Sequence, residues 1–191
     1  MANPDSTPGL GGQDATAARP VDGPVSIGQL ITDMGREFAD RGEYSREFSA
    51  PELVGLVVAT ATEKGVNLDI SKLTYDTTSE PGRVRIGGSA HATGTTIKFD
   101  DYVLGTLPVN DEHGSAIGSR ITPRAAHSDF KISGLGNGLA FNTINHALLS
   151  PTPALRSALE KRGAQFDRMS LAITQEGKIK FTATPPVVRR G

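Results

Sequence analysis

The spacing of apolar residues changes abruptly near residue 65, and this change limits the folds open to the chain. Before residue 65, apolar residues recur every three or four positions, the period of an α-helix. After it they recur at every second position, as in a strand with one buried face. A helical pattern returns between residues 134 and 163, and a period-two hairpin closes the chain. Because helices and strands fall in separate blocks, we expect an α+β domain rather than an alternating α/β one.

Two helices are expected in the first third of the chain. Ser26 with Gln29, and Ser49 with Glu52, have the spacing of capping boxes. The apolar stripe of the first helix consists of Ile27, Leu30, Ile31, Met34 and Phe38. That of the second helix consists of Leu53, Val54, Val57, Val58 and Ala61. Each stripe is followed by a glycine that can end the helix in the left-handed conformation.

The segments after residue 65 are expected to form one curved antiparallel sheet. Turn-forming residues at 79–82 and 110–114 separate the alternating runs, and such short connections favour hairpins. The alternation slips between Ile70 and Leu73, which predicts a bulge or two short strands. Pro123 is expected at an edge or a break, because proline cannot donate to the ladder. The helices should cover the apolar face of this sheet.

The chain divides into a tail, a domain and a second tail. Residues 1–24 are rich in Gly, Pro, Ala, Asp and Thr and have little to bury, so they are expected to form a flexible arm. Residues 25–185 contain all the periodic segments and are expected to form a single α+β domain. Residues 186–191 are a short C-terminal tail.

The composition argues against several classes of function. Twenty Lys and Arg residues against 21 Asp and Glu, with no block of like charge, argue against nucleic-acid binding. The chain has no cysteine, which excludes disulfides, thiolate metal sites and cysteine nucleophiles. No run approaches the roughly 20 apolar residues of a membrane span. The N-terminus lacks a signal-peptide pattern, which favours the cytoplasm unless an export signal has been removed.

No cofactor or catalytic motif stands out. A glycine series at 134–138 precedes a helix, but the dinucleotide fingerprint requires a glycine where Phe141 stands. Asp100 and Asp101 are adjacent carboxylates, and neighbours along a strand point to opposite faces. No Gly-x-Ser-x-Gly elbow is present. The chain has four histidines, at His91, His113, His127 and His146, and they lack the spacing of zinc ligands. We therefore expect no metal and no cofactor.

The order of features resembles a known family. A capped helix begins at 48–53 and leads to a segment at 66–68, a strand reads RVRIGGSA at 83–90, and the chain closes with QFDRMSLAI at 165–173 and a hairpin turn at 176–179. Over roughly residues 48–184 this layout is similar to the LmeA-like family of bacterial envelope proteins, which are related to tubular lipid-binding domains. The resemblance implies an antiparallel sheet curled around helices, an apolar groove for lipid, and a place in the cell envelope.

The expected function is non-enzymatic binding of a lipid-like or other apolar molecule. Small residues at Gly88, Ala90 and Ala92 on the inner face of a strand leave room for close helix packing or for an acyl chain. Large apolar side chains from several segments are the expected lining of the ligand site. They are Phe99, Phe130, Phe141, Leu148, Phe166 and Phe181.

Two other functions stay open. One is a structural or assembly protein, in which the 1–24 arm orders on a protein partner and the sheet edge near Pro123 meets it. The other is a hydrolase that uses His91 or His127, although no nucleophile, base and orienting group can be placed together from sequence. A third helix is expected after residue 138, with Phe141, Ile144 and Leu148 facing inward. A continuous apolar cavity between the sheet and this helix would favour ligand binding, and a packed interior there would favour assembly.

Overall fold

The fold is α+β, with antiparallel strands packed against helices. The computed structural model describes residues 26–62, 65–92, 94–124, 129–134, 142 and 144–187. The predicted arm at residues 1–24 lies outside this part of the chain. The helical elements described are α2 (Ile27–Arg41), α3 (Ala50–Thr62), the π-helical turn η3 (Asn145–Leu149) and α5 (Pro151–Lys161).

The strands form two sheets rather than the single sheet expected. The large sheet has the order β2 (Leu73–Asp76), β3 (Arg83–Ala92), β4 (Thr95–Asn110) and β5 (Ala116–Pro123), and β4 also pairs with β6 (Phe130–Ser133). The small sheet has the order β1 (Tyr44–Phe48), β8 (Ile179–Thr184) and β7 (Arg168–Ile173). The closing hairpin leaves the large sheet because β1, a strand that the sequence pattern did not predict, pairs with β8.

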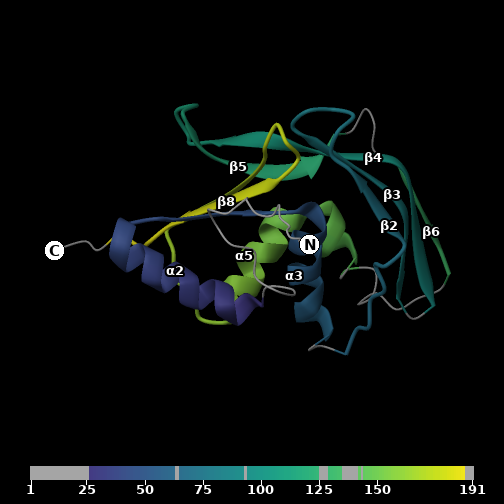
Figure 1. The fold of residues 1–191 in the computed structure, drawn as a ribbon, viewed down its shortest axis with the longest axis horizontal. Coiled ribbons are helices and arrows are strands. Elements are labelled where there is room, and N and C mark those ends of the chain that lie inside the picture. The colour runs from purple at the N-terminus through teal and green to yellow at the C-terminus, as the bar shows by residue number, and fades with distance from the viewer. Residues whose placement is uncertain are drawn as a thin grey trace, which may run out of the picture.

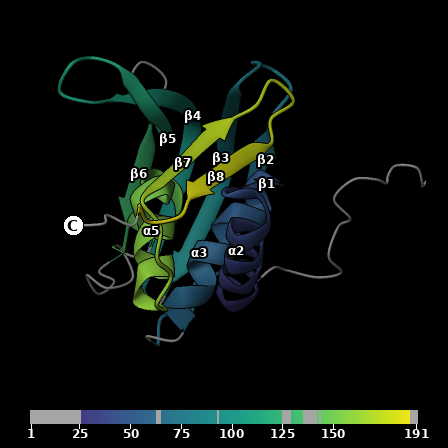
Figure 2. The same ribbon diagram turned by 90° about the vertical axis from the view of Figure 1, so that its left-hand side faces the viewer.

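The two sheets and the helices enclose one apolar interior. In Figure 1, α2, α3 and α5 lie below the sheets, and the large sheet curves down one side of them. Figure 2 shows the β7–β8 hairpin in front of the large sheet, on the same side as the helices. Threonine hydroxyls tie the layers together: the N–H of Ile173 in β7 donates to Thr106 Oγ1 in β4 at 2.7 Å. The N–H of Ile121 in β5 donates to Thr152 Oγ1 in α5 at 2.9 Å.

The predicted caps form almost as expected. Glu52 N–H donates to Ser49 Oγ at 3.2 Å and Ser49 N–H donates to Glu52 Oε1 at 2.8 Å, which completes the capping box of α3. Ser26 Oγ accepts from the N–H of Gln29 at 3.0 Å, but the side chain of Gln29 donates to Asp33 instead of returning to Ser26. The capping box of α2 is therefore only half formed.

Three expected elements differ in detail. The alternation over residues 66–70 produces only an isolated bridge at Asp69, and the regular strand begins at Leu73, so the slip separates two segments. In the described part of the chain, the helical pattern expected between residues 134 and 163 forms the π-helical turn η3 and the helix α5, which begins at Pro151. Pro123 ends β5, a strand at the edge of the large sheet, as predicted.

Candidate functional site

The residues expected to line a ligand site lie in several different places. Phe99 and Phe130 face each other across β4 and β6, with ring centroids 6.4 Å apart, and both rings contact Tyr102. Phe181 belongs to the small sheet and packs between Tyr44 and Phe48, with centroid distances of 5.7 and 6.3 Å. The structure thus separates Phe181 from the cluster around Phe99.

The other predicted lining residues are also dispersed. Leu148 is fully buried on η3. Phe166 precedes β7, and the guanidinium carbon of Arg156 in α5 lies 4.9 Å from its ring centroid. Phe141 lies outside the described residues. Sequence reasoning could select large apolar residues, but it could not show which of them share a wall.

A small apolar cavity lies between the large sheet and the helices α3 and η3. The space that the centre of a water molecule can occupy inside the cavity is about 10 Å³. The cavity therefore has room for about one water molecule. None of the predicted lining residues within the described part of the chain borders it. The lining residues are Ala50, Leu53, Val54, Tyr75, Val84, Ile86, Leu104, Ile121, Ala147, Pro151 and Ile179.

Tyr75 on β2 places its phenol ring at the wall of this cavity. Its hydroxyl oxygen is buried and has no hydrogen-bond partner in the part of the chain that the structure describes. Burial raises the pKa of Tyr75 to about 12, so the phenol stays protonated and can donate a hydrogen bond at neutral pH. The other lining side chains are apolar. Tyr75 is therefore the polar group that a molecule entering this cavity would meet.

A second buried phenol lies at the aromatic cluster of β4 and β6. Tyr102 is 1% exposed, and its hydroxyl is likewise without a partner among the described residues. Burial raises the pKa of Tyr102 well above its usual range. An unpaired buried hydroxyl costs about 1–3 kcal/mol, so each of these two phenols lowers the stability of the interior, as does the buried hydroxyl of Thr95, which also lacks a partner among the described residues.

The small residues of β3 do not all face inward. Ala90 and Ala92 are buried as expected, but Gly88 is exposed and has φ 81°. The reason is an irregular register between β3 and β4, where pairing shifts between Ile86 and Gly88. Gly88 therefore provides no room for an acyl chain on the inner face.

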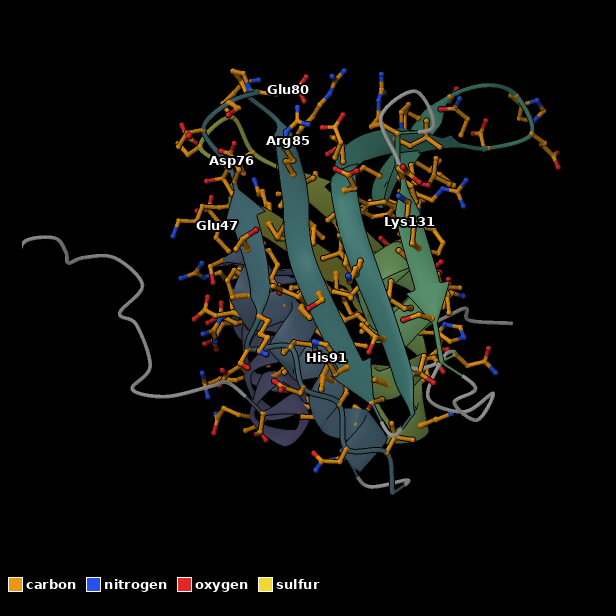
Figure 3. All side chains as sticks on the ribbon, turned by 90° about the vertical axis from the view of Figure 1, so that its right-hand side faces the viewer. Glu47, Asp76, Glu80, Arg85, His91 and Lys131 are labelled. Carbon is orange, nitrogen blue, oxygen red and sulfur yellow. The ribbon has the colours of Figure 1, made fainter. Side chains whose placement is uncertain are left out.

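The same register shift corrects the expectation for the paired carboxylates. Asp100 and Asp101 occupy the extra length of β4, and both are exposed instead of facing opposite sides. Asp101 has φ 59° and forms an ion pair with Arg85 on β3. Figure 3 shows Arg85 and Glu80 at one end of the outer face of the large sheet, with His91 towards the other end.

His91 lies on the outer face of β3 between two hydroxyl groups. Its Nε2 is 2.8 Å from Ser89 Oγ, and its Nδ1 is 3.1 Å from Thr96 Oγ1 on β4. Sequence spacing could suggest Ser89, two residues away on the strand, but Thr96 joins through strand pairing. Both ring nitrogens have hydroxyl partners, so among the described residues no carboxylate orients the ring as in a Ser-His-Asp triad.

The other described histidines show no site geometry. His113 lies in the β4–β5 turn, where its Nε2 is 3.6 Å from Glu112 Oε1. His146 is exposed on η3. His127 lies outside the described residues. Within the described part of the chain, no three His, Cys, Asp or Glu side chains are grouped so that they could hold a metal ion. No helix of that part is long and apolar enough to cross a membrane.

Fold and site together describe an antiparallel α+β domain with an apolar interior, in which the buried hydroxyls of Tyr75 and Tyr102 lack partners among the described residues. Comparison with protein-family models, with curated proteins and with solved structures gives no significant match.

Proposed function

We propose that this domain is a non-enzymatic binding protein for a lipid-like molecule, held between the large sheet and the helices α3 and η3. The observation that carries the proposal is the buried, unpaired hydroxyl of Tyr75 at the wall of an otherwise apolar cavity. A ligand with an apolar body and one oxygen acceptor would satisfy that donor and bury its own apolar surface. The resemblance to the LmeA-like family favours the same ligand class.

Binding requires the helices to move away from the sheet, because the cavity of about 10 Å³ has room only for about one water. Apolar contacts are non-directional, so the acyl chain of a ligand can replace the contacts between helix and sheet at little net loss. Leu53 and Val54 of α3 and Ala147 of η3 supply the helical side of the cavity. These residues are the ones we expect to be displaced.

The proposal predicts opposite effects of Tyr75→Phe on ligand affinity and on stability. Without ligand, the free energy of unfolding is expected to rise by about 1 kcal/mol, because the variant removes an unpaired buried hydroxyl. With ligand, affinity is expected to fall about fivefold, because the hydrogen bond to the ligand is lost. Chemical denaturation and displacement of a fluorescent fatty-acid probe measure the two quantities.

Tyr44→Phe is the matched control. Tyr44 is buried in the small sheet, and its hydroxyl interacts with Arg46. This variant is expected to lower stability and to leave probe affinity unchanged. Native mass spectrometry of gently purified protein should show the extra mass of a carried ligand. Repeated ligand-free spectra together with no probe binding would end the proposal, and a loss of stability in Tyr75→Phe would show that its hydroxyl already has a partner.

A second candidate function is assembly with a protein partner. The observation that favours it is the β4–β5 hairpin, where Leu107, Val109 and Ile117 are each more than a third exposed. Exposed apolar side chains grouped in this way are typical of protein interfaces. The packed interior at the cavity also fits this alternative.

Light scattering after size exclusion tests assembly, with and without residues 1–24. A larger species that requires the 1–24 arm is the result expected for an assembly protein. If the full chain and the chain without residues 1–24 are both monomeric at high concentration, that result would count against self-assembly. Leu107→Ser should reduce any association that uses the hairpin.

A further inference from the structure

Two tyrosines and an isoleucine form one row across the inner face of the large sheet. Tyr75 on β2 is the register partner of Ile86 on β3, and Ile86 is the partner of Tyr102 on β4. Neighbouring strands lie about 4.8 Å apart, so the backbones of the two tyrosines are about 10 Å from each other. All three side chains belong to the apolar interior, where the helices cover the sheet (Figure 1). We call Tyr75 and Tyr102 the phenol pair.

The phenol pair has two hydrogen-bond donors that the described part of the protein does not use. Both hydroxyl oxygens are buried and lack a partner among the described residues. Tyr102 is 1% exposed, so solvent does not reach its hydroxyl in this conformation. Phe99 and Phe130 contact it through their rings and provide no oxygen or nitrogen acceptor. A bound molecule with more than one acceptor would satisfy both donors.

Tyr102 lies beside the cavity that Tyr75 lines. Its partner Ile86 on β3 lines that cavity, and so does Leu104, two residues further along β4. Residues two apart on a strand point to the same face, so Tyr102 and Leu104 both face the helices. A molecule that separates α3 from the sheet at Tyr75 therefore reaches Tyr102 by extending across β3.

The interior around the phenol pair is uncharged in the described part of the chain. None of the described buried residues is acidic or basic, and Tyr75 is the one titratable residue among those that line the cavity. Burial raises the pKa of Tyr75 to about 12 and that of Tyr102 well above its usual range. Both phenols therefore stay protonated donors, and these buried residues include no cation to balance a bound anion. His146 precedes Ala147 on η3, but it is exposed to solvent.

An ionised carboxylate binds poorly in such an interior. An unpaired charge in an apolar environment costs far more than a neutral polar group, and a carboxyl group placed there takes up a proton instead. An ester carbonyl accepts hydrogen bonds from phenols without this cost, because it carries no charge. The surroundings of the phenol pair thus disfavour ionised fatty acids and favour lipid esters.

We propose that the phenol pair binds a neutral lipid ester, with Tyr75 and Tyr102 donating to its carbonyl oxygens. The inference rests on the proposed function and narrows its ligand class from lipid-like molecules to uncharged esters. It also assigns Tyr102, which does not line the present cavity, as a second binding residue. A diacylglycerol has two neighbouring ester carbonyls and so has an acceptor for each donor.

Direct fluorescence titration with pyrenedecanoic acid and with its methyl ester tests the class of ligand. The two probes share one chain and differ in the charge of the head. The acid is expected to bind in its protonated form, so its affinity should rise about tenfold for each unit by which the pH falls from about 8 to about 6. Affinity for the ester should stay constant, which also controls for titration of the protein, His146 included. An acid that binds equally well at both pH values would overturn the proposal.

Tyr102→Phe tests the second donor. Affinity for dioctanoylglycerol, measured by displacement of the methyl ester probe, is expected to fall about fivefold, because one hydrogen bond is lost. Adding Tyr75→Phe should bring the loss to about twenty-five-fold. Without ligand, Tyr102→Phe should raise the melting temperature, because an unpaired hydroxyl leaves the interior. Tyr44→Phe is again the matched control, with unchanged affinity and a lower melting temperature. Unchanged dioctanoylglycerol affinity in Tyr102→Phe would overturn the proposal.

Failure of this inference can be told apart from failure of the proposed function. A protein that binds the acid without any dependence on pH has a lipid site, but not one that selects neutral esters. If neither the acid nor its methyl ester binds, the proposed function itself fails, and the inference fails with it.

Discussion

Phe181→Ala is expected to lower the free energy of unfolding by about 3–5 kcal/mol, the usual cost of truncating a fully buried phenylalanine. Phe181 has no exposed surface and stands on β8, the central strand of the small sheet. Its ring meets Tyr44 edge-on, with an angle of 65° between the rings, and it also contacts Phe48. The truncation removes two aromatic contacts and leaves a cavity that flanking strands cannot close. Urea denaturation followed by circular dichroism measures the loss.

Phe130→Ala is the matched control for this prediction. Phe130 is only partly buried on the edge strand β6, so its truncation should cost clearly less. Domains of this size are commonly stable by 5–15 kcal/mol, so Phe181→Ala removes a large share of the total. If that variant fails to fold, Phe181→Leu gives a smaller loss in the same direction. A value for Phe181→Ala within about 1 kcal/mol of the unchanged protein would contradict a core role.

Phe181→Ala also tests whether Phe181 contributes to packing or to ligand binding, because the sequence predicted this residue in a ligand site. Phe181 does not border the cavity that Tyr75 lines. We therefore expect the loss of stability in Phe181→Ala without a matching loss of probe affinity in the remaining folded protein. A selective loss of affinity would instead place the ligand near the small sheet.

Local signals in the sequence predicted the elements whose formation depends on near neighbours. The capping box of α3 joins residues three positions apart, and the structure contains both of its hydrogen bonds. The strand β1 was missed for the opposite reason. Its five residues are buried only at the two ends, and Tyr44 finds its partner Ala183 near the far end of the chain. No local pattern contains that pairing.

The surroundings of Tyr75 and the alignment of three lysines could not be predicted from sequence for the same physical reason. Tyr75 borders its cavity together with α3, η3 and β5, which come from distant parts of the chain. The composition shows no cluster of positive charge, yet the strand register gathers Lys72, Lys98 and Lys131 into one row. Charge clustering on a sheet depends on register, which a linear count of charges does not contain.

Gly88→Ala is expected to lower the free energy of unfolding by about 3 kcal/mol or more, because strain and collision act together. Gly88 has φ 81°, and the left-handed conformation alone costs a residue with a Cβ about 1–2 kcal/mol. A Cβ there would also lie 2.0 Å from the carbonyl oxygen of Lys72. That carbonyl accepts a hydrogen bond from Ser89 N–H, so it cannot move away without breaking the link between β2 and β3.

Gly82→Ala is the control that separates the cost of the left-handed conformation from the cost of the collision. Gly82 has φ 78°, but a Cβ there would have no atom within 4 Å. This control should therefore cost only the 1–2 kcal/mol of the left-handed conformation. The difference between the two variants, measured by urea denaturation, reports the collision with Lys72. Equal losses would mean that β2 shifts freely against β3. In that case the backbone link between Lys72 and Ser89 would not be fixed by the fold.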